Sequence, residues 1–551
     1  MADFTRNNLD KATSPYLQQH KGNPIHWQEW SAEAVEYARK EGRLLFVSVG
    51  YSTCHWCHVM AGEAFEDKEV ADYLNRHFVP IKVDREQRPD IDHYLMAFCV
   101  ETTGSGGWPL NVIMAPDIRP VTAMTYVPVE PKYGMAGLID ILQAARDYYE
   151  ERKDKIREYH PPAENQTNFT KEQVIKEIKS GFDDENGGFG HGMKFPPHNT
   201  LLFLLQYYEK HKNEEIRHVL EKTLDVIMMR GLHDHLQGGF YRYCTDSSWT
   251  IPHFEKMLYD QAMLLWVYSW ASKVLGKYEY RIVAEMIIKC LEETFEGDGL
   301  FYSAHDADTN HEEGGTYLWT KTELENALST GEFRRLAELY DITDKGNLEG
   351  KNHLIKKEGL RLDDIENKLL KIRKAREQPF IDKKVITSWN ALAGIGLLMA
   401  HRHAGTAGAK EKSELLFKKL MEKHYIDGKL YHSSLDNNIQ KNEFLEDYAS
   451  MLLFASLLHE ETGDKKGVME ELYKKTMEFK KEHWVENKVG DFIETPAQQM
   501  DHPAPSSVSL ADFAVFRAAS ILGNEAEKPG YGKPLERDFA SLAALISRNM
   551  A

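Results

Sequence analysis

Residues 44–50 form one continuous apolar run without period-two alternation. Such a run predicts a strand that is covered on both faces in a parallel or mixed sheet. The stretch that follows, 51–60, reads Tyr-Ser-Thr-Cys-His-Trp-Cys-His-Val-Met and predicts a helix that begins at its first cysteine. An amphipathic helix is predicted between Ser31, a good N-cap, and Gly42, a good C-terminal stop. These elements indicate an α/β layer around a central sheet.

The pattern then continues with a second helix over 68–77 and a strand over 78–84. A Gly-rich turn, 102–108, leads through Pro109 into a strand over 111–114, and a proline that opens a strand in this way is one place where a cis peptide bond can form. A hairpin turn, a returning strand over 121–127 and a helix over 137–158 complete this unit.

Residues 159–168 are polar and carry two prolines, so we interpret them as a linker. Beyond them the chain is predicted to be helical, and two of the helices, around 262–267 and 391–399, are apolar nearly all round, which predicts an inner ring of helices screened by an outer one. The helical stretches are 201–212, 214–230, 261–275, 280–295, 362–376, 388–403, 444–461 and 466–482.

Short turns that pair glycine with an aromatic residue recur between these helices. They predict short extended hairpins and, as a weak internal repeat, a toroid of helical hairpins. The turns lie at 186–190, 237–241, 298–302 and 427–431. The predicted organisation is a domain over 1–158, a linker over 159–168 and a helical domain over 169–551.

The chemistry of the first domain centres on its Cys-x-x-Cys motif. Cys54 is placed where unpaired backbone N–H groups and the helix dipole favour an anion, which lowers its pKa and supplies a thiolate nucleophile. His55 would lower the thiol pKa further when protonated. Cys57, one turn later, is placed to resolve a mixed disulfide.

Three other interpretations of this motif remain open. Cys54-x-x-Cys57-His58 matches the attachment sequence of c-type haem, but that chemistry needs export, and residues 1–8 lack the apolar core of a signal peptide. A structural zinc site needs four ligands, whereas the other cysteines are scattered singly. The pair could also be inert. We therefore favour thiol redox chemistry and expect neither a metal nor a cofactor.

Composition narrows the class of protein. A chain of 551 residues exceeds the size of a single core, so several domains are expected. An odd number of cysteines, five, argues for a reducing, cytoplasmic compartment. The net charge of −18 argues against nucleic-acid or anionic-lipid partners, and no apolar run is long enough to span a membrane.

Several stretches of the first domain carry a resemblance to a known family. Its order of elements resembles the thioredoxin fold, and its motifs resemble the spermatogenesis-associated protein 20 family. The motifs are Ser14-Pro15-Tyr16-Leu17 and the stretches 50–60, 82–86 and 106–112. In thioredoxin-like proteins the loop proline that faces the dithiol is cis, and the resemblance gives that role to Pro109.

The second domain resembles the (α/α)₆ toroid of the same family, which is related to six-hairpin glycosidases and N-acylglucosamine 2-epimerases. The motifs that carry this resemblance are 194–196, 252–260, 304–308, 387–390 and 445–449. One departure is Pro-Ser-Ser-Val-Ser at 505–509, where the family usually reads Pro-Ser-Gly-Asn-Ser. Because the chain also ends early for the family, the toroid is expected to lack its last helices or to close differently.

Polar residues at loop-to-helix junctions of the toroid are candidates for a pocket that binds a sugar-like ligand. Paired carboxylates suit glycoside hydrolysis, and a pair of histidines suits proton transfer next to a carbonyl. Each residue could instead be a helix cap, a salt bridge or part of the core. The candidates are His253, Glu255, Asp260, Asp306, Asp308, Trp389, Asn390, Glu446 and Asp447.

Two classes of function follow. The first is a thiol–disulfide protein that uses Cys54, Cys57 and Pro109, with a protein disulfide or thiol as partner and a toroid that binds a sugar-like molecule or a protein. The second is a sugar-active enzyme, an epimerase, isomerase or glycosidase, whose thioredoxin-like domain is a redox sensor or scaffold. A third possibility is that both domains are binding modules. We favour the first, because its active motif is complete.

Overall fold

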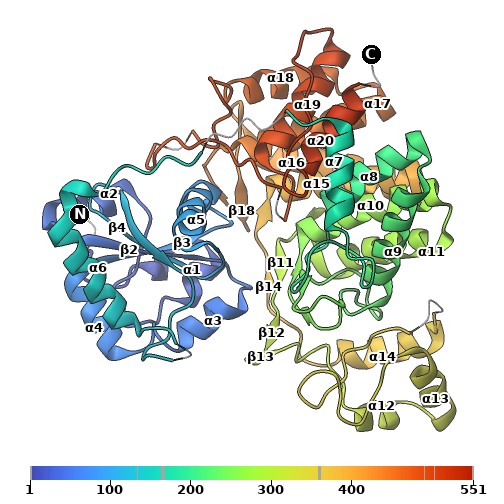
Figure 1. The fold of residues 1–551 in the computed structure, drawn as a ribbon, viewed down its shortest axis with the longest axis horizontal. Coiled ribbons are helices and arrows are strands. Elements are labelled where there is room, and N and C mark those ends of the chain that lie inside the picture. Colours follow the sequence, from blue (N-terminus) through green and yellow to red (C-terminus); the bar gives the residue numbers. More distant parts are fainter. Residues whose placement is uncertain are drawn as a thin grey trace. The chain divides into compact units, whose positions relative to one another are not determined.

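A computed structural model describes residues 3–132, 134–162, 168–357, 361–488, 490–501 and 503–548. The chain forms two compact units (Figure 1). Unit 1 comprises residues 1–163 together with two later segments, 432–444 and 485–496, and unit 2 comprises the remainder. Residues 163–167 of the predicted linker lie outside the described part. The boundary predicted from the sequence did not anticipate the two later segments.

Unit 1 is built on a mixed sheet of five strands in the order β1-β3-β2-β4-β5. Strand β2 runs parallel to β3 and antiparallel to β4, and β4 runs antiparallel to β5. Every residue of β2 and β3 is buried, as the unbroken apolar run predicted. The strands are β1 (Gln28–Glu29), β2 (Leu44–Gly50), β3 (Phe78–Asp84), β4 (Leu110–Met114) and β5 (Pro120–Met124).

Helices cover both faces of this sheet. Side chains of α3, α4, α6 and the N-terminal arm (residues 9–27) pack on the face that carries Phe46, whereas α2 and α5 pack on the face that carries Val47. Ser31 caps α2 and Gly42 ends it in the left-handed conformation, as predicted. The helices are α1 (Pro15–Gln19), α2 (Ala32–Glu41), α3 (His55–Gly62), α4 (Lys68–His77), α5 (Pro89–Thr103) and α6 (Leu138–Arg152).

The segment 485–496 packs around the first turn of α5, and His432 of the segment 432–444 lies 2.9 Å from the carbonyl of Glu86, just before that helix. Arg88, its N-terminal neighbour, forms ion pairs with Asp90 at 2.9 Å and with Asp491 at 3.0 Å. The indole of Trp30 donates to the carbonyl of Asp491 and meets the ring of Phe492 edge-on. The earlier segment carries the hairpin β18 (Ser433–Leu435) and β19 (Asn438–Gln440). Residues far apart in the sequence therefore share one core.

Unit 2 contains a closed ring of helices. Among its described residues, α8, α10, α15, α17, α19 and α20 each pack against the next, and α20 packs against α8. The predicted inner helices α10 and α15 are buried along almost their whole length. The ring comprises α8 (His198–His211), α10 (Leu258–Leu275), α15 (Thr387–Met399), α17 (Leu445–Thr462), α19 (Ser507–Leu522) and α20 (Asp538–Ser547).

Outer helices pack against this ring. They are α7 (Lys171–Gly181), α9 (Glu214–Met229), α11 (Tyr278–Cys290), α16 (Ala409–His424) and α18 (Lys466–Met477). The sequence pattern did not predict α19 or α20, which close the inner ring in the region where we expected the last helices to be absent or the ring to close differently. The toroid in the described part of the chain is thus complete in its inner layer.

Short hairpins and a small helical cluster lie between the ring helices. Two of the predicted glycine–aromatic turns form hairpins, β9 with β10 and β16 with β17. The hairpin strands are β9 (Glu296–Gly297), β10 (Leu300–Phe301), β16 (Tyr425–Ile426) and β17 (Lys429–Leu430), and the cluster comprises α12 (Lys321–Ala327), α13 (Thr330–Leu339) and α14 (Asp363–Lys374). Within the described part of the chain, no helix is both long and apolar enough to cross a membrane.

Candidate functional site

The cysteine pair lies at the start of α3, directly after the buried strand β2. Cys54 is the N-cap of α3, and its Sγ accepts a hydrogen bond of 3.2 Å from the backbone N–H of Cys57. The two cysteines form a disulfide and are 3% and 1% exposed. The ring of Trp56, between them, is half-exposed and packs on Tyr126. His58 Nε2 lies 2.8 Å from the carbonyl of Ser52.

The loop before β4 carries the predicted proline. The peptide bond between Trp108 and Pro109 is cis. The ring of Trp108 meets Tyr51 edge-on at 5.9 Å, and its indole N–H donates to Asp92 at 2.7 Å. The guanidinium of Arg85 lies 4.0 Å from the centre of the Trp108 ring. This loop is therefore anchored beside the residues that lead into the dithiol.

The remaining cysteines, Cys99, Cys244 and Cys290, are buried free thiols. Burial raises the pKa of each of these thiols, which disfavours their thiolate forms. Among the five cysteines, Cys54 and Cys57 are therefore the better candidates for thiol chemistry.

Polar side chains that the sequence analysis did not assign lie beneath the disulfide. Lys82 of β3 is 1% exposed, and its ammonium donates to the hydroxyl of Ser48 in β2 at 3.0 Å. Tyr16 of α1 is fully buried, and Asp84 accepts a hydrogen bond of 2.5 Å from Ser14. The signal for this site is a serine in β2 and a lysine in β3 that each stand between two apolar residues.

In unit 2, the structure brings several predicted residues together on adjacent short strands. His253 lies 2.5 Å from the carboxylate of Glu313 through Nδ1 and 3.4 Å from Glu255 through Nε2. Glu255 is fully buried and accepts a hydrogen bond of 2.7 Å from Arg242. The strands involved are β7 (Pro252–His253), β8 (Lys256–Met257), β11 (Ala304–His305), β12 (Asp308–Thr309) and β13 (Glu312–Glu313).

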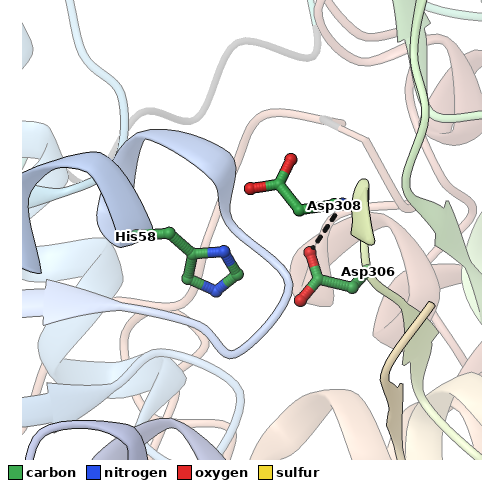
Figure 2. A group of neighbouring side chains, drawn as sticks. All are labelled: His58, Asp306 and Asp308. Atoms are coloured by element: carbon green, nitrogen blue, oxygen red, sulfur yellow. Dashed lines mark hydrogen bonds between the residues drawn. The ribbon is translucent and has the colours of Figure 1, made fainter. Parts of the chain in front are cut away.

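Asp306 and Asp308 join this group through the same strands. Asp308 pairs with Glu313 across the β12–β13 hairpin, and β11, which ends next to Asp306, pairs with β8. The backbone N–H of Asp308 donates to Asp306 at 3.1 Å, as drawn in Figure 2. The sequence analysis missed Arg242 and Glu313, whose roles depend on strand pairing.

A second set of predicted residues lies at the starts of the inner helices. Asp260 of α10 is fully buried and lies 3.0 Å from Nε2 of His198 in α8. Burial raises the pKa of Asp260, and the hydrogen bond from His198 opposes this shift. The charge of Glu255 also raises the pKa of Asp260. The residues around His253 and those at the start of α10 are therefore near each other. Two histidine–carboxylate pairs therefore flank this end of the ring.

Helices α15 and α17 supply the remaining predicted residues. Trp389 meets Tyr259 of α10 edge-on at 4.7 Å, and Asp447 of α17 accepts a hydrogen bond of 3.0 Å from the N–H of Ser388. Asn390 is bonded to backbone groups of Phe301 and Ile386, which gives it a structural role. Glu446 lies in the first turn of α17 and is half-buried.

Known proteins resemble this chain over part or most of its length. A family model described as Thioredox_DsbH, a protein of unknown function (DUF255), matches residues 6–189. The chain is 33% identical over 605 residues to an uncharacterized protein of Caenorhabditis elegans. This alignment covers 95% of this chain and 82% of that protein. The chain is also 34% identical over 525 residues to human spermatogenesis-associated protein 20. This second alignment covers 80% of this chain and 66% of the human protein.

The chain thus spans about two thirds of the human relative's length. Among solved structures, cellobiose 2-epimerase from Spirochaeta thermophila is similar with a TM-score of 0.44 and 11% identity, over 68% of this chain and 80% of that one. The long alignments with the curated relatives, rather than this distant likeness, determine the assignment. The chain belongs to the spermatogenesis-associated protein 20 family.

Proposed function

We propose that the protein is a thiol–disulfide redox protein in which Cys54 is the attacking thiolate and Cys57 the resolving thiol. The observation that carries this proposal is the capping geometry of Cys54, whose Sγ accepts the Cys57 N–H at the start of α3. A helix N-terminus stabilises an anion there, so it favours the thiolate when the pair is reduced.

The reaction is an exchange of one disulfide for another. The Cys54 thiolate attacks a sulfur of the partner's disulfide, a mixed disulfide forms and the first partner thiolate leaves. Cys57 then attacks Cys54 Sγ, the Cys54–Cys57 disulfide forms and the second partner thiol is released. The partner gains two electrons, and a dithiol reductant restores the protein.

Two neighbouring groups suit a protein or peptide partner. The loop before β4 carries Pro109, and the Trp108 ring anchors this loop next to Tyr51. The half-exposed ring of Trp56 offers apolar surface beside Cys54. In this proposal, unit 2 binds the partner protein or a sugar-like ligand and thereby determines which disulfide substrates react with Cys54 and Cys57. Since the other cysteines are buried free thiols, the proposed compartment is the reducing cytoplasm.

The test is disulfide reduction by the full chain, with dithiothreitol as reductant and a small protein disulfide as substrate. We expect turnover by the wild type, none by Cys54→Ser, and trapping of a mixed disulfide by Cys57→Ser. Turnover by Cys54→Ser at the wild-type rate would contradict the proposal.

A second candidate function is sugar chemistry in unit 2. The observation that favours it is the pairing of His253 with Glu313 and of His198 with Asp260, because a histidine held by a carboxylate can move a proton. A panel of sugars and glycosides, assayed with the wild type and Asp306→Asn, tests this candidate. Sugar turnover that Asp306→Asn abolishes and Cys54→Ser leaves unchanged, without disulfide reduction, would make unit 2 the enzyme.

A further inference from the structure

Lys82 is a buried titratable group that the exchange reaction above does not use. Its ammonium nitrogen lies 4.2 Å from the centre of the Phe65 ring, 4.8 Å from that of Trp27 and 5.1 Å from that of Tyr16. Its hydrogen-bond acceptor is the hydroxyl of Ser48. The N-terminal arm supplies both Tyr16 and Trp27, so part of this aromatic enclosure comes from the arm.

This enclosure acts on the charge of the lysine in two ways. Aromatic faces attract a cation, whereas the loss of water disfavours it. Burial is the dominant cause and moves the pKa of Lys82 well below its usual value, which makes the neutral amine available at lower pH than in water. Tyr16 and His20 of the arm are its titratable neighbours, and Asp84 of β3 and His58 of α3 in turn lie near these two side chains. Burial and the nearby Lys82 both lower the pKa of His20.

The same face of the sheet leads from Lys82 to the resolving thiol. Ser48 and Lys82 are paired in the register of β2 and β3, and Gly50 follows two residues later on the face of Ser48. A methyl group at Gly50 would lie 2.3 Å from the Tyr16 hydroxyl oxygen and 2.8 Å from Cys57 Sγ. The tyrosine hydroxyl and the thiol sulfur therefore flank one point of β2.

Cys57 needs such a neighbour because it is only 1% exposed. A buried thiol must lose its proton before it can attack a disulfide, and bulk water does not reach it. The Ser48 hydroxyl, which binds the Lys82 ammonium, also acts on the Tyr16 hydroxyl as a hydrogen-bonding neighbour. Each of the two hydroxyls can accept one proton and donate another, and Lys82 lies at the far end of the pair.

We propose that Lys82, through the hydroxyls of Ser48 and Tyr16, is the internal proton acceptor of Cys57. This inference rests on the proposed function and specifies its second step. The Cys57 thiol passes its proton along the hydroxyls to the neutral amine, which becomes an ammonium. The thiolate attacks Cys54 Sγ, the Cys54–Cys57 bond forms, and the bond from Cys54 to the partner breaks. The partner leaves as a thiolate and takes a proton from water.

The experiment separates the two steps in the full chain. The reduced protein is mixed with one equivalent of 5,5′-dithiobis(2-nitrobenzoate), whose coloured thiol is released once when Cys54 attacks and again when Cys57 resolves the adduct. Cys57→Ser, which gives only the first release, assigns the phases. Both rates are measured between pH 6 and pH 9 in the wild type, Lys82→Met and Tyr16→Phe.

We expect Lys82→Met and Tyr16→Phe to slow the second release at least tenfold at pH 7 and to leave the first within threefold. The second rate should then rise about tenfold per pH unit, because hydroxide replaces the amine as proton acceptor. Tyr94→Phe is the matched control, since it removes a hydroxyl that donates to the Tyr159 carbonyl elsewhere in unit 1. We expect it to leave both phases unchanged.

Each other outcome has a defined meaning. A second release with the wild-type rate and pH profile in both variants would overturn the inference and leave the proposed function intact. The absence of any first release from the wild type would overturn the proposed function, and the inference with it. If Lys82→Met does not fold, Tyr16→Phe decides alone, because it keeps the aromatic ring and removes only the hydroxyl.

Discussion

Gly50 is the residue at which the strand, the arm and the dithiol meet. Because a Cβ there would overlap both Tyr16 and Cys57, we expect Gly50→Ala to cost about 1–3 kcal/mol of unfolding free energy. Urea unfolding followed by tryptophan fluorescence measures this loss. Gly62→Ala is the control, since a Cβ at Gly62 meets no atom within 4 Å and alanine is the better helix former. An equal effect of the two substitutions would show that the close approach at Gly50 is unimportant.

The cysteines supply a second prediction at this scale. In the reduced protein we expect Cys54 to be alkylated with an apparent pKa below that of a free thiol, because its thiolate caps α3. Cys99, Cys244 and Cys290 should stay unmodified until the protein unfolds, since burial raises the pKa of each thiol. Mass spectrometry after iodoacetamide treatment across pH 5–9 gives the site-specific rates. Equal rates at Cys54 and Cys99 would contradict the assignment.

Sequence reasoning could reach Cys54 and Cys57 because their role depends on local spacing alone. Lys82 and Ser48 were out of its reach, because a lysine in a strand normally points to solvent, and this one is enclosed only once the arm and Phe65 pack around it. The same limit applies to Glu313, whose contact with His253 depends on the pairing of separate short strands.

Among the elements of unit 1, strands β2 and β3 were predictable from their mainly apolar sequences, and α2 from its cap residues and amphipathic pattern. Helix α5 was not predicted, because it buries Asp90 and Asp92 in its first turn together with apolar residues on several sides. Its carboxylates are matched by Arg88 and Arg85, and no local pattern shows those partners.

The segment 485–496 yields a prediction at the scale of elements. Phe492 is 9% exposed and packs edge-on against Trp30 at 5.2 Å and Tyr94 at 5.5 Å. We expect Phe492→Ala to destabilise unit 1 by about 3 kcal/mol, because it opens a cavity in that core. The readout is the urea midpoint of unit 1, followed as the Cys99 thiol, which is buried in the same core, becomes open to alkylation.

The matched control is Phe380→Ala in unit 2, where the ring is 46% exposed and its removal should change little. If Phe492→Ala leaves the urea midpoint of unit 1 unchanged, the segment 485–496 contacts unit 1 but does not stabilise it. Sequence reasoning could not place the segment, because a short polar stretch between helices carries no signal of which core it joins.

At the scale of the whole toroid, closure of the inner ring depends on α20. Asp538 begins this helix and accepts a hydrogen bond from the hydroxyl of Thr200 in α8. Asp501 accepts hydrogen bonds of 2.8 Å from the N–H groups of Ser506 and Phe539 and so ties α19 to α20. The sequence showed the inner helices with unbroken apolar runs, but the closing contact joins residues more than three hundred positions apart, which no local pattern reveals.

Asp538 makes this closure sensitive to pH. Burial raises the pKa of its carboxyl to about 7, and the nearby Asp501, whose own pKa is raised to about 6, adds to the shift. The native state therefore holds a proton that the unfolded state releases near pH 4, so this carboxyl's contribution is full below pH 4 and is lost as pH rises to 7. The native pKa corresponds to a loss on the order of 4 kcal/mol.

The change that isolates this group is Asp538→Asn, which keeps the shape and cannot ionise. We expect the difference in unfolding free energy between the wild type and the variant to move in favour of the variant between pH 5 and pH 8. Urea unfolding of both proteins at several pH values measures it. Asp341→Asn, an exposed carboxylate of unit 2, is the control and should give a difference that does not vary with pH. If the difference in unfolding free energy for Asp538→Asn is also independent of pH, the Asp538 carboxyl ionises in the folded protein as readily as in the unfolded chain. The contact between α20 and α8 then does not depend on its proton.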